Sequence, residues 1–489
     1  MYSQSIAHFD SPIIMNKPTP INSLPPEILI RIFHIVVAYP RNLCPDLACS
    51  KQYYPKYPDY LAQVCTLWRG IAHSTSTLWC RVDLSPNKPY CDKLTTRAQA
   101  HLAHAGQLPI ELRIAVNGID HRNLECDEVL RLISLISSRV ESLELAMAGS
   151  LRHFHRGVFR FLFGQRPVLT KFVLLHHSYP CDSFLVANSF VSTDGEDLYS
   201  KYMRLNSTED EMESSFAQLT VFHTRGIFPL WSSKAYHGLV DLRLWTDTSL
   251  HIREAELVTI LKSSPGLRIL HFELNMHDST PVAEEVTPVE LRDLQVIRII
   301  PNDGGPLEPR PGSVLRLLAP GTKPLRLTLE GFYIQDAEMV TDPERFFARS
   351  RVTRFYTQMV LPPLNLLLRH SASLEQVVVD YFKSSSHSQL SSNSTGLQLE
   401  LDEPASLPRL KSLHVTRSAL FDHELCMLLK CYPDGIVLNL CDIHRHIGID
   451  HPYTTLDAVD MLEAFPTVRI TDHTRYPEKA PTADWDVLD

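Results

Sequence analysis

The stretch that decides the N-terminal fold is residues 24–33, which read LPPEILIRIF. Pro25 can stand early in a helix, because the amide hydrogen that it lacks would have no partner there. Glu27 places a carboxylate in the first turn, where the helix dipole favours negative charge. The apolar residues recur at helical spacing, so the stretch predicts an amphipathic helix that Tyr39-Pro40 ends. Asn22 and Ser23 are suited to cap it.

A second apolar segment follows at residues 64–79, VCTLWRGIAHSTSTLW. Together with Leu61 it predicts a second helix with Trp68 on its apolar face, then a short turn ending at Trp79 and a strand from Arg81. A unit of about sixty residues cannot bury this much apolar surface alone. The surplus belongs to a partner protein, unless these residues form a small self-contained core.

These two segments resemble the F-box, the helical module by which substrate receptors dock onto the Skp adaptor of cullin-type ubiquitin ligases. The form is that of mushroom-type (basidiomycete) fungi, and the match covers residues 21–85. The resemblance implies a non-enzymatic substrate-recognition subunit that binds the Skp adaptor, and through it a cullin, and presents an unknown substrate protein. The adaptor contacts that it implies are Leu24, Pro25, Ile28, Leu29, Ile32, Phe33, Val64 and Trp68. Sequence alone does not separate those that face the adaptor from those that face the interior.

From about residue 100, Leu-rich alternating segments follow helical stretches. The clearest is residues 238–244, GLVDLRL, followed by a predicted helix over 254–262 and a strand over 267–274. Such a unit cannot bury its own face, so neighbours must stack. Further strands are predicted within 108–114, 140–145, 168–174, 291–296, 325–329, 374–379 and 407–415.

The expected fold class is therefore α/β: a small helical F-box followed by an irregular leucine-rich-repeat-like solenoid of parallel strands and helices. An ordinary α/β domain with a parallel sheet would show the same alternation. The polar insertions 188–215 and 384–396 are predicted to be mobile loops. The domain boundaries are a disordered tail (1–20), the F-box (21–86), the repeat region (87–472) and a C-terminal tail (473–489).

The composition argues against several classes of protein. A formal charge of −9 and a pI near 6.2 argue against a general nucleic-acid binder. The chain has no apolar run long enough for a membrane span and no secretory signal, which favours a cytoplasmic or nuclear protein without a membrane partner. Ten cysteines without paired short spacings fit reduced thiols.

No motif for catalysis, cofactor or metal is found. The phosphate-binding glycine loop, the paired-histidine zinc helix and the serine nucleophile elbow are all missing from the sequence. Cys44 and Cys49, with Cys65 and Cys80, have the wrong spacing for a zinc site. The prediction is therefore no enzyme and no cofactor. A non-degradative interaction scaffold, or an α/β enzyme with an unrecognised site, is the alternative.

A row of basic side chains alternates with apolar residues along the predicted inner strands. Such a row can recognise a phosphorylated or acidic partner, but solvent-facing positions of half-buried strands look the same and are the favoured interpretation. The residues are Arg243, Arg268, Arg298, Arg326, Lys411 and His414.

Overall fold

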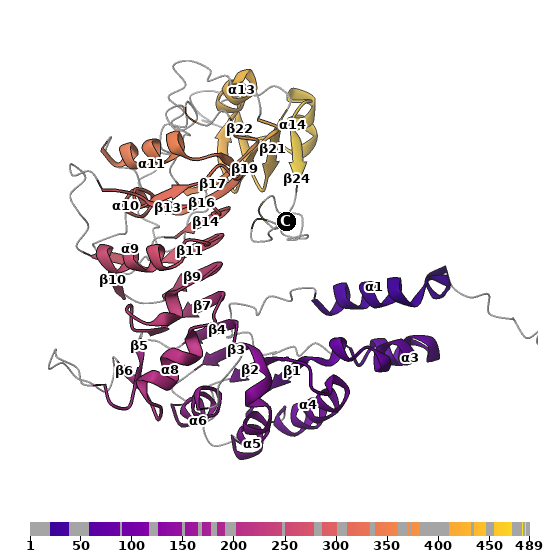
Figure 1. The fold of residues 1–489 in the computed structure, drawn as a ribbon. Helices are drawn as coiled ribbons and strands as arrows, with labels where there is room; N and C mark the ends of the chain where they lie inside the picture. Colours follow the sequence, from indigo (N-terminus) through magenta and orange to yellow (C-terminus); the bar gives the residue numbers. More distant parts are fainter. Residues whose placement is uncertain are drawn as a thin grey trace, which may run out of the picture.

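The computed structural model describes residues 20–38, 58–88, 90–116, 126–148, 152–164, 169–177, 183–190, 202–246, 250–277, 286–300, 311–332, 338–359, 370, 373–380, 410–431, 435–445, 454–471, 482 and 485. The described chain is α/β, with short N-terminal helices leading into one long open sheet (Figure 1). Within these residues, no helix has both the length and the apolar character that crossing a membrane requires.

The N-terminal helices are short and closely spaced in the chain. They are η1 (Pro20–Ser23), α1 (Pro26–Ala38), α2 (Leu61–Val64), α3 (Thr66–Ser74) and η2 (Ser76–Trp79). The first helix ends at Ala38, immediately before the Tyr39-Pro40 pair that predicted its end.

The single helix predicted to carry both Leu61 and Trp68 is wrong, because the chain breaks at Cys65. This residue is extended, with φ −158° and ψ 174°, and its sulfur accepts a hydrogen bond from the Trp68 amide at 3.5 Å as the N-cap of α3. The apolar spacing continues across the break, so the pattern does not reveal it.

The main sheet of the described residues has 14 strands, every neighbouring pair is parallel, and their spatial order is their chain order. The strands are β1 (Arg81–Leu84), β2 (Ile110–Val116), β3 (Val140–Ala148), β4 (Lys171–His177), β7 (Val221–Arg225), β9 (Asp241–Trp245), β11 (Ile269–Glu273), β14 (Val296–Ile299), β16 (Leu325–Phe332), β17 (Val352–Met359), β18 (Gln376–Asp380), β19 (Ser412–Thr416), β21 (Ile436–Asn439) and β24 (Arg469–Thr471).

One buried apolar residue from each of the first 13 strands, β1 to β21, lies beside the next, in register across the sheet. Alternation places it on the covered face of each of these strands, so the row forms a continuous core that no single unit could make. The row is Val82, Leu112, Leu143, Phe172, Phe222, Leu242, Leu270, Ile297, Leu327, Phe355, Val377, Leu413 and Ile436.

Figure 1 shows the helices on the outer, convex side of the curved sheet and the strands on its inner, concave side. The helices are α4 (Cys91–Ala105), α5 (Cys126–Ile136), α6 (Arg152–Phe163), α8 (Glu209–Phe216), α9 (Glu254–Ser263), α10 (Pro311–Leu315), α11 (Glu338–Arg349), α13 (Asp422–Cys431) and α14 (Ala458–Ala464). Four smaller sheets accompany the main one in the described chain. Two of them have three strands each: β6 (Tyr202–Leu205), β5 (Ser183–Ala187) and β8 (Ile227–Pro229) form one, and β20 (Ala419–Phe421), β22 (Asp442–Arg445) and β23 (Thr454–Thr455) form the other. The other two have two strands each, β10 (His251–Arg253) with β12 (Asn275–His277), and β13 (Val289–Leu291) with β15 (Leu318–Pro320).

The predicted α/β class with parallel strands is confirmed, and two local predictions are wrong. Residues 291–296 contain the end of β13, a turn and the start of β14 rather than one strand. The insertion 188–215 was predicted to be a loop but contains β6 and most of α8. A capping box between Thr208 and Glu211 starts α8, and the buried Met212 anchors it. The other insertion, 384–396, lies outside the described residues.

Candidate functional site

The N-terminal helices pack around buried side chains that belong to the same hydrophobic core as the sheet. Leu29 and Phe33 on α1 are fully buried, and the Phe33 ring centroid lies 4.8 Å from that of Trp68 on α3. The indole N–H of Trp68 donates to the side-chain oxygen of Asn22 at 3.0 Å. The buried Trp79 donates to the Ala72 carbonyl at 2.7 Å. These contacts fix the helices against one another without any outside protein.

The same helices leave large apolar side chains in solvent. Ile28, Ile32 and Ile35 are four and three residues apart, so they share one face of α1 next to the buried stripe. Six of the twelve large hydrophobic residues exposed in the described chain lie within residues 21–67, which concentrates exposed apolar area on this small part. We call these six the N-terminal apolar surface: Ile21, Ile28, Ile35, Tyr60, Val64 and Leu67.

The eight adaptor contacts that the F-box resemblance implies differ in their exposure to solvent. Pro25, Ile28 and Val64 are exposed, and Leu24, Ile32 and Trp68 are half-buried. Leu29 and Phe33 are fully buried, so they support the module from inside and present nothing to a partner in this conformation.

Four members of the N-terminal apolar surface are not among those eight residues: Ile21, Ile35, Tyr60 and Leu67. Ile35 had a sequence signal, because it follows Ile28 by seven residues, or two helical turns. The exposure of Tyr60 and Leu67 had no signal in the sequence.

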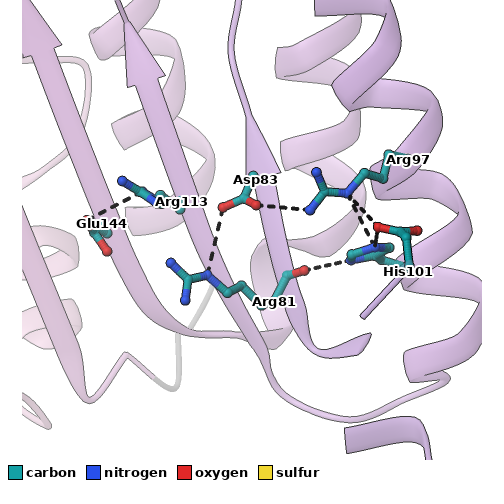
Figure 2. Close-up of polar contacts among 7 residues, drawn as sticks. Arg81, Asp83, Arg97, His101, Arg113 and Glu144 are labelled. Atoms are coloured by element: carbon teal, nitrogen blue, oxygen red, sulfur yellow. Dashed lines mark hydrogen bonds and ion pairs between the residues drawn. The ribbon is translucent and has the colours of Figure 1, made fainter. Parts of the chain in front are cut away.

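A polar cluster attaches the helices to the first strand of the sheet. Arg97 on α4 bridges two carboxylates: its Nε lies 3.1 Å from Asp59, just before α2, and its Nη2 lies 3.2 Å from Asp83 on β1. His101, one turn further along α4, places Nδ1 2.8 Å from the Arg81 carbonyl and Nε2 3.3 Å from Asp59. Figure 2 shows Arg81, Asp83, Arg97 and His101 converging from β1 and α4.

The electrostatics of this cluster favour the ionised form of Asp59. Burial alone would raise its pKa, but the hydrogen bond with His101 and the charges of His101 and Arg97 lower the pKa below its ordinary value. Asp83 is almost fully buried, so Arg97 supplies the charge that an interior carboxylate needs. The cluster links the residue before α2 to α4 and the first strand of the sheet.

The ring of Trp79 adds an apolar contact at the same junction. Its centroid lies 4.5 Å from that of His104, 5.2 Å from that of His101 and 5.5 Å from that of His73. Burial, together with the neighbouring His73 and His101, lowers the pKa of His104. A neutral imidazole packs on the indole without carrying a charge into the junction.

The concave face carries the predicted row of basic residues, and several of them have acidic neighbours. Arg243 pairs with Asp241 at 2.9 Å, Arg298 with Glu330 at 2.7 Å, and Lys411 with Glu375 at 2.6 Å. The other three residues of the row contact neutral groups. Arg268 contacts Gln295, Arg326 contacts the Trp485 carbonyl, and His414 contacts Gln376 and Ser412. The carboxylates compensate much of the row's charge, so the face is not uniformly basic.

The described residues enclose one cavity whose lining bears on enzymatic function. A cavity of about 270 Å³ between α6 and α8 is lined by Arg160, Phe161, Gly164, Asn206, Ser207 and Glu211. Glu211 is engaged in the α8 capping box, and this lining contains no Cys, His or Lys to serve as nucleophile or base. No group of three metal-binding side chains occurs in the part of the chain that the structure describes.

The cysteines weighed as zinc ligands lie apart or have other contacts. Cys65 caps α3, the Cys80 thiol donates to the Ser76 carbonyl at 3.6 Å, and Cys44 and Cys49 lie outside the described residues.

Comparison with known proteins adds no assignment. No protein-family model matches the chain, and no curated protein matches it. The function must therefore be argued from the residues themselves.

Proposed function

We propose that this chain is a substrate-recognition subunit of a Skp–cullin–F-box ubiquitin ligase. The N-terminal helices would bind the Skp adaptor, and the sheet region would bind an unknown protein. The observation that supports this most is the N-terminal apolar surface, which stays exposed although Leu29 and Phe33 of the same helices are fully buried. Exposed apolar area of this kind is typical of a surface that a partner covers.

We further propose that residues 87–472 form a leucine-rich-repeat-like solenoid. Parallel strands in chain order and a row with one buried apolar residue from each strand up to β21 support this, because stacked repeats produce both features. A solenoid offers a long concave surface for a protein ligand. The chain would act without bond-making residues of its own, by raising the effective concentration of the bound protein near a ubiquitin-charged enzyme.

Co-purification with a basidiomycete Skp adaptor tests the docking step. The full chain is expected to retain the adaptor, and Ile35→Glu should lose it, because a carboxylate would enter a desolvated apolar interface. Leu135→Glu on α5 is the matched control, since Leu135 is 66% exposed against 67% for Ile35. Loss of the adaptor in both variants, or in neither, would contradict the proposed surface.

Reconstituted ubiquitination of the protein captured by the sheet region separates a degradative receptor from a scaffold. Ubiquitin transfer that depends on Ile35 is expected for the receptor. Adaptor binding without transfer would identify the scaffold instead.

A further inference from the structure

Trp485 lies on the concave face of the sheet, far in sequence from the strands that it contacts. Its side chain is buried, with 3% exposed. Its carbonyl accepts a hydrogen bond from Arg326 Nη1 on β16 at 3.2 Å, across 159 positions. Its ring meets the Tyr356 ring on β17 edge-on, with the two centroids 6.5 Å apart. β16 and β17 lie side by side toward the C-terminal end of the sheet (Figure 1).

The floor of this site is fixed by a polar network. The Tyr356 hydroxyl donates to Asp380 Oδ2 on β18 at 2.8 Å, and Arg417 Nε donates to Asp380 Oδ1 at 2.8 Å, with Nη2 binding the second oxygen. Asp380 is buried. Burial and the nearby Asp380 and Glu330 raise the pKa of Tyr356, so its hydroxyl keeps the proton that it donates.

Arg417 holds an uncommon backbone conformation to make this contact. Its φ is +53°, a region that side chains other than glycine rarely adopt. A strained residue that orients a buried carboxylate, which in turn orients an aromatic ring, indicates a rigid binding surface rather than an incidental contact.

Trp485 fits the site incompletely. Its indole N–H is buried but has no hydrogen-bond acceptor among the described residues. A buried donor without a partner weakens an interaction, because the water that it gave up is not replaced. Trp485 therefore occupies the site weakly, and a ligand whose polar groups all find partners there can displace it.

The charge around the site indicates what a better ligand is. Arg326 and Arg354 are register partners on β16 and β17, so both lie on the face of the sheet that carries Tyr356. The carboxylates near Tyr356 already have basic partners, because Arg417 binds Asp380 and Arg298 binds Glu330. In the sequence, Trp485 stands between Asp484 and Asp486, so the segment that supplies the indole is acidic. Guanidinium groups bind carboxylates well, and an adjacent aromatic ring accommodates an aromatic side chain.

We propose that Arg326 and Tyr356 form a recognition site for an acidic peptide segment with one aromatic residue, and that Trp485 occupies this site within the chain until such a segment displaces it. The inference rests on the proposed function only in taking the natural ligand to be the protein that the sheet region recruits. The peptide site itself does not involve the N-terminal helices.

A labelled peptide with the sequence of residues 481–489 is the probe, and the full chain is the binder. Fluorescence anisotropy is expected to show at least tenfold tighter binding to Trp485→Ala than to the unmodified chain. The reason is that a tethered competitor acts at an effective concentration of about a millimolar. The same peptide with alanine at the position of Trp485 should bind neither protein. Equal affinity for the two chains would overturn the proposal.

Second substitutions in the Trp485→Ala chain locate the site. Arg326→Ala should weaken peptide binding at least tenfold, whereas Lys171→Ala, at an exposed position on the same face of β4, should change it less than twofold. Tyr356→Phe keeps the ring and should retain binding within about threefold, provided that thermal unfolding shows a folded chain. An equal loss with Lys171→Ala would indicate only general charge attraction and would contradict the site.

Adaptor co-purification with Trp485→Ala distinguishes this inference from the proposed function. That variant should bind the adaptor as the unmodified chain does. If peptide binding fails while adaptor binding persists, the concave site alone is wrong. If the adaptor fails to bind while the peptide binds, the docking function alone is wrong.

Discussion

The indole N–H of Trp68 donates to the side-chain oxygen of Asn22 at 3.0 Å, joining α3 to the turn before α1 across 46 positions. The same indole packs on Phe33. One side chain thus closes the interior of the N-terminal helices, while Ile28 and Ile35 on α1 remain in solvent. The buried and the exposed apolar side chains are therefore different residues of the same short segment.

Substitutions of Trp68 should separate its two contacts. Trp68→Ala is expected to lower the free energy of unfolding by about 2–4 kcal/mol, less than for a fully buried tryptophan because Trp68 is half-buried. Trp68→Phe keeps ring packing but removes the donor to Asn22, and should cost about 1 kcal/mol. Urea denaturation followed by circular dichroism measures both. Equal losses for the two variants would show that the ring contact with Phe33 contributes little.

Leu29 and Ile35 offer a matched comparison on a single helix. Leu29→Ala removes a fully buried side chain and should cost about 2–5 kcal/mol. Ile35→Ala, at a position 67% exposed, should change stability by no more than about 0.5 kcal/mol while weakening adaptor binding. Thermal unfolding and adaptor titration of both variants test whether Leu29 contributes to stability and Ile35 to adaptor binding. A stable Leu29→Ala chain would mean that the helix interior is not as described.

Arg97 should be essential to the junction between α2 and the sheet. Arg97→Met leaves Asp83 buried without its nearest cation, and the expected cost is about 3 kcal/mol, as for breaking an interior ion pair. Asp83→Asn in the same chain should recover part of that loss, because it removes the buried charge, for which only Arg81, at 3.8 Å, would remain as a cation. A double-mutant cycle by chemical denaturation gives the coupling. Additive effects of the two substitutions would rule out direct coupling between them.

The buried His155 on α6 predicts acid sensitivity. Burial, with a smaller contribution from His176, lowers its pKa from the ordinary 6.5 to about 3. The unfolded chain binds the proton first as the pH falls, so this residue's contribution to stability is complete above pH 6.5 and is lost between about pH 6.5 and 3. The slope is about 1.4 kcal/mol per pH unit.

His155→Leu should reduce that slope. Unfolding free energies of the unmodified and variant chains, measured by denaturant titration between pH 5 and 7.5, should converge at the high end and diverge at the low end. Parallel curves would show that His155 does not titrate on unfolding in this range.

Local sequence signals predicted much of the fold. Apolar alternation located β9 and β11, and the first-turn carboxylate and helical spacing located α1 and α9. These signals failed where a contact between residues distant in sequence decides the structure, or where a helix ends without a change in the apolar pattern. Cys65 interrupts a continuous apolar pattern, and α8 lies in a polar stretch that only its capping box and the buried Met212 and Phe216 make helical.

The candidate sites were predictable to different degrees. The F-box resemblance named exposed and buried residues of the N-terminal helices together, because Leu29 and Ile28 differ only in what packs against them. The Trp485 site had no signal in the chain at all. Its partners, Arg326 and Tyr356, lie more than a hundred residues earlier in the sequence.

The sequence by itself determined the alternation of strand and helix, because that pattern follows from residues within a few positions of one another. Only the tertiary structure decided which side of α1 is closed by Trp68, how Arg97 fixes the helices to β1, and where Trp485 lies. The physical reason is that burial is a property of the whole packed chain. Periodicity identifies an apolar face, but only the residues that pack against that face decide whether it remains exposed.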